Sequence, residues 1–181
     1  MSLKTGDCQA LSYLPLGIRS KAVARRTAIF SECGTYRYQL IVREPRGFGV
    51  ATFVMLNPST ADEMKDDPTV RRCRGFAVRW GFQEVRVVNL FALRSTDPKA
   101  LYSDASPVGP ENDAAIVGAA MTSDRVVAAW GVHGSLLGRD KAVSELLYRF
   151  NISCLGRTKD GSPKHPLYLK SDSKLVNWRT A

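Results

Sequence analysis

Three polar side chains occur next to apolar segments or prolines in the sequence. At such positions their hydrogen-bonding groups can contact a ligand. Asn57 precedes a proline, which restricts its backbone and gives its amide a defined direction. Asn89 ends another apolar segment, and an amide can read a nucleobase edge with paired donor and acceptor. His165, held before Pro166 among basic residues, can donate to a developing anion. These three residues can therefore orient a ligand or a water molecule and stabilise negative charge.

Each of these residues also has a purely structural interpretation. Asn57 can be a turn former that satisfies only the local backbone, Asn89 a cap-like polar group, and His165 a structural histidine. The loop from Ala129 to Gly134 follows a further apolar segment, and its glycines allow close backbone approach. Trp130 in that loop is expected in the core rather than as a ligand platform.

The elements that must position these residues follow from the spacing of apolar side chains. Asp67 is expected to cap a helix that begins at Pro68 and ends at Gly81. Two further helices are expected over residues 110–121 and 136–150, and residues 156–164 form a polar loop. Strands are expected over residues 25–31, 35–43, 50–56, 84–91, 125–130 and 152–155.

Strands that alternate with helices at this spacing indicate an α/β fold with a mostly parallel central sheet covered by helices. The first two strands form an N-terminal β-hairpin, with Gly34 at the turn. We expect residues 1–18 to be a flexible arm and residues 19–181 a single domain. In such sheets the working site lies beyond the carboxyl ends of the strands, where Asn57 and Asn89 fall.

Composition narrows the class of protein. The 181 residues carry 26 Lys and Arg against 17 Asp and Glu, a formal charge of +9, which favours a polyanionic partner, most simply nucleic acid. The alternative is that the charge serves solubility alone. No apolar stretch is long enough for a membrane helix, and the first 18 residues lack a secretory signal pattern, so we expect a cytoplasmic protein. The four cysteines include no C-x-x-C pair, so no metal site and no cofactor are expected.

Several short motifs occur in the order found in the uracil-DNA glycosylase superfamily. They are MLNPS at 55–59, NLFALRSTDP at 89–98, VVAAWG at 126–131 and HPLYL at 165–169. The NPS segment is similar to the Gly-x-Asn-Pro-Gly motif of that superfamily, and HPLYL resembles its His-Pro-containing motif. The whole pattern over about residues 25–170 resembles, more closely still, a bacterial and phage family catalogued as a domain of unknown function.

The glycosylase resemblance implies a three-layer α/β/α arrangement and a role for each matching residue. Asn57 would orient the water that attacks the sugar, and His165 would stabilise negative charge on the departing base. Asn89, together with Ser59, would bind the base. Leu169 would be the wedge that fills the gap left by a flipped nucleotide. Either Phe76 or Phe91 would stack on the base, and Asp62 would replace or assist Asn57.

The sequence departs from the glycosylase pattern at defined positions. Met55 and Ser59 stand where the motif has glycine, and the cysteine cluster of the thermostable branch is missing. Uracil specificity is therefore not implied, and we expect an N-glycosidic hydrolase that acts on an uncommon or modified base. The alternatives are a non-catalytic nucleic-acid or nucleotide-binding module on the same scaffold, and a small-metabolite or protein-interaction domain.

The charge is unevenly distributed along the chain. Residues 19–46 and residues 149–181 each hold seven Lys and Arg against two Asp and Glu, whereas residues 81–148 are net acidic. The second basic segment flanks His165, where a glycosylase-like fold meets the phosphate backbone. We therefore expect one face beside His165 to carry Arg157, Lys159, Lys164 and Lys170.

Overall fold

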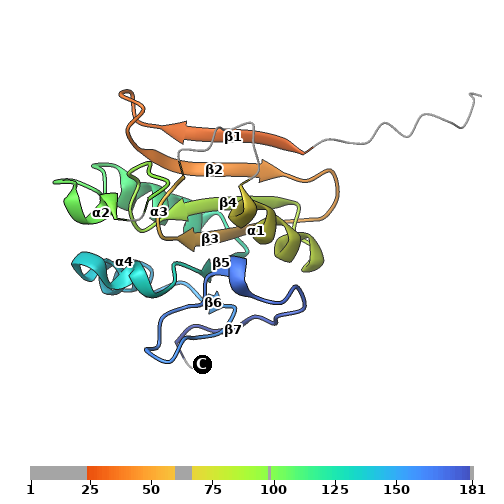
Figure 1. Ribbon diagram of the computed structural model, residues 1–181. Helices are drawn as coiled ribbons and strands as arrows, with labels where there is room; N and C mark the ends of the chain where they lie inside the picture. The colour runs from red at the N-terminus through yellow and green to blue at the C-terminus, as the bar shows by residue number, and fades with distance from the viewer. Residues whose placement is uncertain (1–23, 60–66, 98, 180–181) are drawn as a thin grey trace, which may run out of the picture.

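The computed structural model describes residues 24–59, 67–97 and 99–179, and its central feature is a seven-stranded sheet (Figure 1). The strands lie in the order β1-β2-β4-β3-β5-β6-β7. The four strands β4, β3, β5 and β6 are mutually parallel, and the pairs β1–β2, β2–β4 and β6–β7 are antiparallel. The strands span β1 Arg25–Phe30, β2 Arg37–Arg43, β3 Val50–Met55, β4 Glu84–Asn89, β5 Arg125–Ala128, β6 Ile152–Cys154 and β7 Val176–Asn177.

The predicted fold class is confirmed at this level. The chain is a mixed α/β protein whose sheet is mostly parallel in its centre, and its first two strands form the predicted hairpin. Met55 at the end of β3 pairs with Asn89 at the end of β4, so these two strands end at the same edge of the sheet. The loops that follow them therefore start side by side.

Within the described residues, four α-helices and two short 3₁₀ segments connect the strands. The helices are α1 Pro68–Arg79, α2 Ala100–Ser103, α3 Asn112–Met121 and α4 Arg139–Leu146, and the 3₁₀ segments are η1 Val132–Gly138 and η2 Pro166–Tyr168. Asp67 caps α1 as predicted, because its Oδ1 accepts a hydrogen bond from the Val70 amide at 2.7 Å. None of the described helices is long and apolar enough to cross a membrane.

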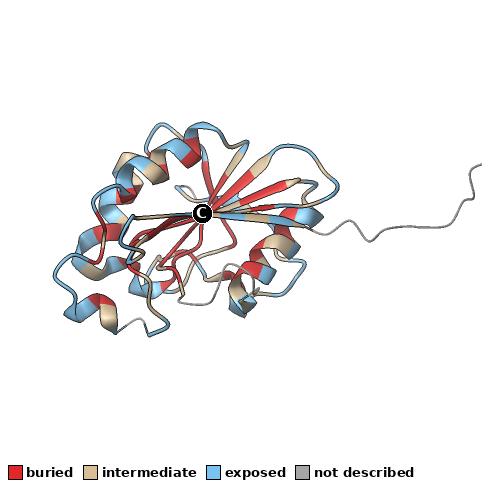
Figure 2. Cartoon of the chain, turned by 90° about the horizontal axis from the view of Figure 1, so that it is seen from above, coloured by how far each residue is buried: buried red, intermediate tan, exposed pale blue. Residues whose placement is uncertain are grey.

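The buried apolar side chains form two clusters that use alternate residues of the central strands. Val54 and Val88 belong to the cluster that includes residues of α3 and α4. Phe53 and Val87 belong to the cluster that includes the apolar side of α1. Because successive strand residues point to opposite faces, the two clusters lie on opposite faces of the sheet. The central strands are accordingly buried over most of their length (Figure 2).

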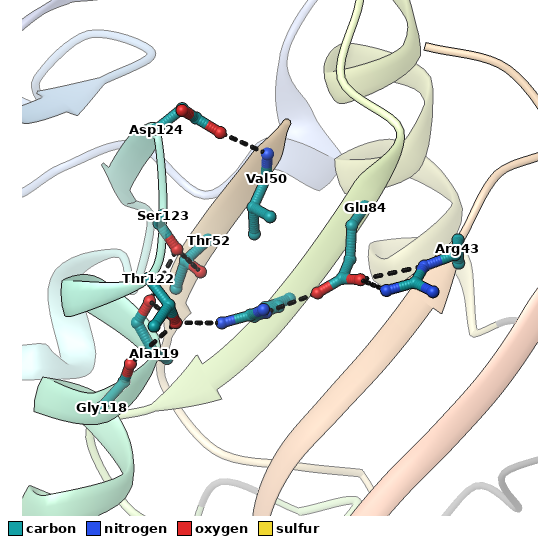
Figure 3. A network of polar contacts seen from close by, with 10 residues as sticks. Arg43, Val50, Thr52, Glu84, Gly118, Ala119, Thr122, Ser123 and Asp124 are labelled. Carbon is teal, nitrogen blue, oxygen red and sulfur yellow. Dashed lines mark hydrogen bonds and ion pairs between the residues drawn. The ribbon is translucent and has the colours of Figure 1, made fainter. Parts of the chain in front are cut away.

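A polar network fastens the end of the sheet where β3 and β4 begin (Figure 3). Glu84 accepts hydrogen bonds from Arg43 Nε at 3.1 Å and from Arg86 Nε at 2.7 Å, and Asp124 Oδ2 accepts the Val50 amide at 2.7 Å. Burial alone would raise the pKa of Glu84, but the two arginines outweigh it and the pKa is lowered. Ion pairs and hydrogen bonds thus connect the strands at this end of the sheet. The loops that follow β3 and β4 leave from the opposite end.

The structure corrects the boundaries of the helix expected over residues 136–150. The α-helix begins only at Arg139, because Leu137 and Gly138 have φ angles of 53° and 64°, which a right-handed helix does not contain. It ends at Leu146, before the expected Phe150. The short elements α2, η1, η2 and β7 have no periodic apolar pattern and are absent from the sequence-based expectation.

Candidate active site

A cavity of about 630 Å³ opens at the carboxyl edge of the parallel strands. Its walls come from the ends of β3 and β4, the loop after β5, the first turn of α1 and the segment around η2. A volume of this size is typical of sites for small molecules and cofactors. Its polar and charged lining residues include Arg37, Asn57, Asn89, Lys164, His165 and Tyr168.

Asn57 lies at the exit of β3, and its amide direction is fixed by the backbone around it. Its Nδ2 donates to the Ser95 carbonyl at 2.9 Å and to the Pro58 carbonyl at 3.2 Å. Part of the structural interpretation is therefore correct, because this amide does satisfy backbone groups. The same bonds use only the donor end, which leaves Oδ1 to accept a hydrogen bond from a ligand or a water molecule.

Asn89, at the end of β4, places a buried amide side chain in the wall of the cavity. Its side chain is 1% exposed, and neither Oδ1 nor Nδ2 has a hydrogen-bond partner within the described part of the chain. Its backbone is held firmly, since Asn112 Nδ2 donates to the carbonyls of Asn89 and Leu90, both at 2.9 Å. A buried amide without partners costs about 1–3 kcal/mol, so a water molecule, an ion or a ligand that pairs with it would be stabilising.

His165 is held as a neutral ring with a defined tautomer. Its Nδ1 accepts the Leu167 amide at 3.3 Å, so we assign the ring proton to Nε2. Burial lowers the pKa of His165, although the nearby Asp67 carboxylate acts in the opposite direction. The ring leans against Tyr168, with centroids 5.7 Å apart. The arrangement leaves an N–H donor available for an acceptor or an anion in the cavity.

Ser59 and Asp67 are coupled to each other at the cavity wall. Ser59 Oγ donates to Asp67 Oδ2 at 3.0 Å, while Oδ1 of the same carboxylate caps α1. Both residues line the cavity, so the first turn of α1 and the loop after β3 are joined there. Asp62, the other carboxylate that the sequence suggests, lies outside the described residues.

The loop after β5 approaches the site through two glycines. Gly131 has a φ of 75°, and its amide donates to the Pro163 carbonyl at 3.0 Å. A Cβ added at Gly134 would come within 2.1 Å of the Trp130 ring, so only glycine fits there. Trp130 lines the cavity and belongs to the core, where its ring meets Trp178 edge-on with centroids 5.5 Å apart.

Phe76 and Phe91, either of which was expected to stack on a base, do not line this cavity. Both rings are fully buried, one against α1 neighbours including Trp80 and the other in the cluster that holds α3 and α4. Phe76 lies on the buried side of α1 and Phe91 in the segment after β4, and neither lines the cavity. A core aromatic and a stacking aromatic have the same sequence pattern, and only tertiary packing separates them.

Leu169, which was expected to be the wedge, lines the cavity. Leu169 is half-buried and packs against the cluster on the α1 side, and its carbonyl accepts a hydrogen bond from Arg72. A wedge must project from the surface, and in this segment Tyr168 does so, with 83% of its surface exposed.

The four basic residues expected on one face beside His165 do not all lie there. Lys164 lines the cavity, but Arg157 stacks over the Trp178 ring, with its guanidinium carbon 4.5 Å from the ring centroid. Lys159 and Lys170 are exposed and do not line the cavity. Cation–π stacking accounts for Arg157, and solvation accounts for the two lysines.

Sequence reasoning missed one charged residue of the cavity, Arg37. It lies at the start of β2, is 5% exposed and lines the same cavity as Asn89. The alternating pattern of β2 gives no sign of its role, because an arginine in a hairpin strand ordinarily faces solvent. The signal that exists is topological: β2 runs antiparallel to β4, so the start of β2 lies where β4 ends.

No group of three or more His, Cys, Asp or Glu side chains that could hold a metal ion occurs among residues 24–59, 67–97 and 99–179. Cys33, Cys73 and Cys154 are free thiols. The polar groups that line the cavity are amides, the His133 and His165 rings, the Asp67 carboxylate, the cations of Arg37 and Lys164, and several Ser, Thr and Tyr hydroxyls.

Comparison with known proteins gives a family. The profile of the family described as "Protein of unknown function (DUF1643)" matches residues 37–167. The chain belongs to this family. The match extends from Arg37 to Leu167 and so includes Asn57, Asn89 and His165. The description of the DUF1643 family states no activity. The comparisons found no matching curated protein and no matching solved structure.

Proposed function

We propose that this DUF1643 protein is an N-glycosidic hydrolase that removes an uncommon or modified base from nucleic acid, on a three-layer scaffold like that of the uracil-DNA glycosylases. The observation that carries the proposal is the Asn89 side chain, buried in the cavity wall with both polar atoms unpartnered. A nucleobase edge, which offers donor and acceptor side by side, is the complement of that amide.

The other two residues supply what the reaction needs. Water adds to C1′ of the sugar as the bond to the base nitrogen breaks, and the electron pair leaves on the base. Asn57 Oδ1 is suited to hold that water, and His165 Nε2–H to stabilise the anionic base. The water then gives one hydrogen to the base and its oxygen to the sugar, so the products are a free base and an abasic sugar.

The test is release of a base from oligonucleotides that each contain one uracil, hypoxanthine or phage-type modified base. Abasic sites are scored by strand cleavage in alkali. We expect cleavage with at least one base, and its loss in the variants Asn57→Ala and His165→Ala. Asn151→Ala is the matched control, because Asn151 is exposed and lies outside the cavity. Equal rates in all four proteins would contradict the assigned roles.

A non-catalytic binding module is the second candidate, and one observation favours it. Asp67 is the sole carboxylate among the described residues that line the cavity, and both of its oxygens already accept hydrogen bonds. As far as the described residues go, a water in this cavity would then be oriented by an amide and not deprotonated by a carboxylate. Oligonucleotide binding that persists without any abasic product would support this second candidate.

A further inference from the structure

Exposed apolar side chains lie at the mouth of the cavity. Tyr168 and Val132 both line it, and most of the Tyr168 surface and about half of the Val132 surface are open to solvent. Leu167, next to Tyr168 in η2, is also exposed. Tyr102 of α2 is 60% exposed, and its hydroxyl lies 3.5 Å from Nδ1 of His133, another lining residue. We call Tyr102, Val132, Leu167 and Tyr168 the apolar rim.

We propose that the apolar rim binds single-stranded nucleic acid, with Tyr168 and Tyr102 as stacking surfaces for the nucleotides that flank the base held in the cavity. This inference rests on the proposed function of the cavity and specifies the form of its substrate, which is a single strand rather than a duplex.

Tyr168 has a fixed position beside the groups that face the ligand. The His165 ring lies on one side of it, with centroids 5.7 Å apart and planes inclined at 48°. Arg72 of α1 donates to the carbonyls of Pro166 and Leu169, which flank the tyrosine in the chain. Because the segment is anchored in this way and the ring is still 83% exposed, Tyr168 offers a planar surface that loses little conformational freedom when a base stacks on it.

Tyr102 reaches the mouth of the cavity from a different segment. It lies on α2, shortly after the loop that follows β4, and Thr96 of that loop lines the cavity. Each of the two histidines in the chain therefore has a tyrosine beside it, Tyr102 at His133 and Tyr168 at His165. Both histidines line the cavity, so two separate exposed rings adjoin one ligand site.

Exposed aromatic rings favour a single strand because stacking needs a base with an uncovered face. In a duplex both faces of each base are covered by its neighbours, whereas a single strand can turn successive bases outward without breaking base pairs. Stacking on an aromatic ring tolerates any base, since every base has a π-face. The apolar rim can therefore hold the neighbours of the bound base whatever their sequence.

The charge around the cavity agrees with this form of substrate. A duplex is bound largely through many phosphate contacts, which require clustered Lys and Arg side chains. Among the described residues that line the cavity, the cations are Lys164, which is exposed, and Arg37, which is buried. Lys159 and Lys170 lie outside it. One accessible lysine beside two exposed rings suits a strand that is bound by stacking together with a small number of phosphate contacts.

The first experiment compares nucleic acids and leaves the protein unchanged. Fluorescence anisotropy measures the binding of the full chain to a labelled mixed-sequence strand of about 12 nucleotides, a length within the usual range of single-strand sites. The probes are the DNA strand, the RNA strand of the same sequence and the DNA duplex. We expect at least one single strand to bind about fivefold or more tightly than the duplex, because each stacked base contributes on that order. Duplex binding that equals or exceeds that of both single strands overturns the proposal.

Tyrosine variants assign the preference to the apolar rim. Tyr168→Ala and Tyr102→Ala should each weaken single-strand binding about fivefold or more, and Tyr168→Phe should restore it because the ring is kept. Tyr148→Ala is the matched control, since Tyr148 is similarly exposed and lies outside the cavity. Equal affinities of Tyr168→Ala, Tyr102→Ala and Tyr148→Ala overturn the stacking role. The comparison of single strand with duplex in the unsubstituted protein keeps the test valid if a variant fails to fold.

Base release from the same oligonucleotide forms separates this inference from the proposed function. Release from duplexes but not from single strands overturns the single-strand assignment and leaves the hydrolase. Single-strand binding that depends on Tyr168, without release from any oligonucleotide, supports the assignment and overturns the hydrolase. Absence of binding and of release with every probe overturns both.

Discussion

The backbone of Asn89 is held by hydrogen bonds, whereas its buried side chain has none within the described residues. The effect of this side chain on stability and on ligand binding can be measured. Replacing it with leucine removes two buried polar atoms that have no partner within the described residues. We expect Asn89→Leu to leave the free energy of unfolding unchanged or to raise it by about 1 kcal/mol, while binding of nucleosides is lost. Urea denaturation and calorimetry on the same preparations give the two quantities.

Asn112→Leu is the matched control for this prediction. Asn112 is equally buried, but its amide donates to two backbone carbonyls, so its removal takes a buried donor from the Asn89 and Leu90 carbonyls, of which Leu90 keeps its bond from Arg139 Nε. We expect that variant to lose about 1–3 kcal/mol of stability. If Asn89→Leu destabilises the protein as much as Asn112→Leu does, the Asn89 side chain has a structural partner and the ligand assignment fails.

His165 should make stability depend on pH in a definite direction. Burial lowers the pKa of its ring in the folded protein, so the unfolded chain takes up a proton at higher pH than the folded chain does. The neutral ring contributes fully to the free energy of unfolding at pH values above the ordinary histidine pKa of about 6.5. This contribution is lost as the pH falls from about 6.5 through the lower pKa of the folded protein. Protonation also turns Nδ1 into a donor, which removes the bond from Leu167.

The comparison variant for this pH effect is His165→Asn, whose amide oxygen can accept the same backbone amide and does not titrate. Between pH 7.5 and pH 5.5, the free energy of unfolding should fall more for the unsubstituted protein than for the variant. Parallel pH curves for the two proteins would mean that the folded ring titrates like an exposed one.

At the scale of the elements, α1 controls the segment that carries His165. Arg72 on α1 donates from Nε to the Pro166 carbonyl at 3.4 Å, reaches the Leu169 carbonyl with its other end, and lies over the Phe76 ring. Arg72→Lys keeps the charge but loses the fork that spans the two carbonyls. Because η2 then shifts, we expect kcat for base release to fall about ten- to a hundredfold with little change in KM.

The NMR resonances of the His165 ring report that shift independently of any activity. They should move in Arg72→Lys and stay in place in Arg79→Lys, a substitution of an exposed arginine in the last turn of the same helix. An unchanged ring environment in Arg72→Lys would remove Arg72 as a positioning residue.

The elements that could be predicted from sequence are those whose pattern is local. The apolar runs of β3 and β4 and the Asp67–Pro68 start of α1 are such signals, and they place Asn57 and Asn89 at one edge of the sheet. The break before α4 depends on the left-handed backbone at Leu137, which periodicity does not reveal. Arg37 depends on the pairing of β2 with β4, and the burial of Phe76 on tertiary packing, so neither could be read from spacing.

At the scale of the whole molecule, the excess positive charge is divided between distant places. The basic segment 19–46 includes β1 and β2 at one edge of the sheet, and the segment 149–181 includes β6 and β7 at the other. Individual charges are further committed to contacts, such as Arg43 with Glu84 and Arg157 with Trp178. The described residues therefore do not gather their positive charge into the single basic face beside His165 that the sequence led us to expect.

This division predicts a shallow salt dependence of nucleic-acid binding, in which Lys164 at the cavity wall contributes one identifiable contact. Lys164→Ala should weaken the binding of a labelled oligonucleotide and reduce the slope of log affinity against log salt concentration by about 1. Lys174→Ala, an exposed lysine outside the cavity, should leave the slope unchanged. Fluorescence anisotropy between 50 and 200 mM salt measures both slopes. Equal slopes for the two variants would mean that Lys164 contacts no phosphate group beside His165. The net charge of +9 would then be explained by solubility alone.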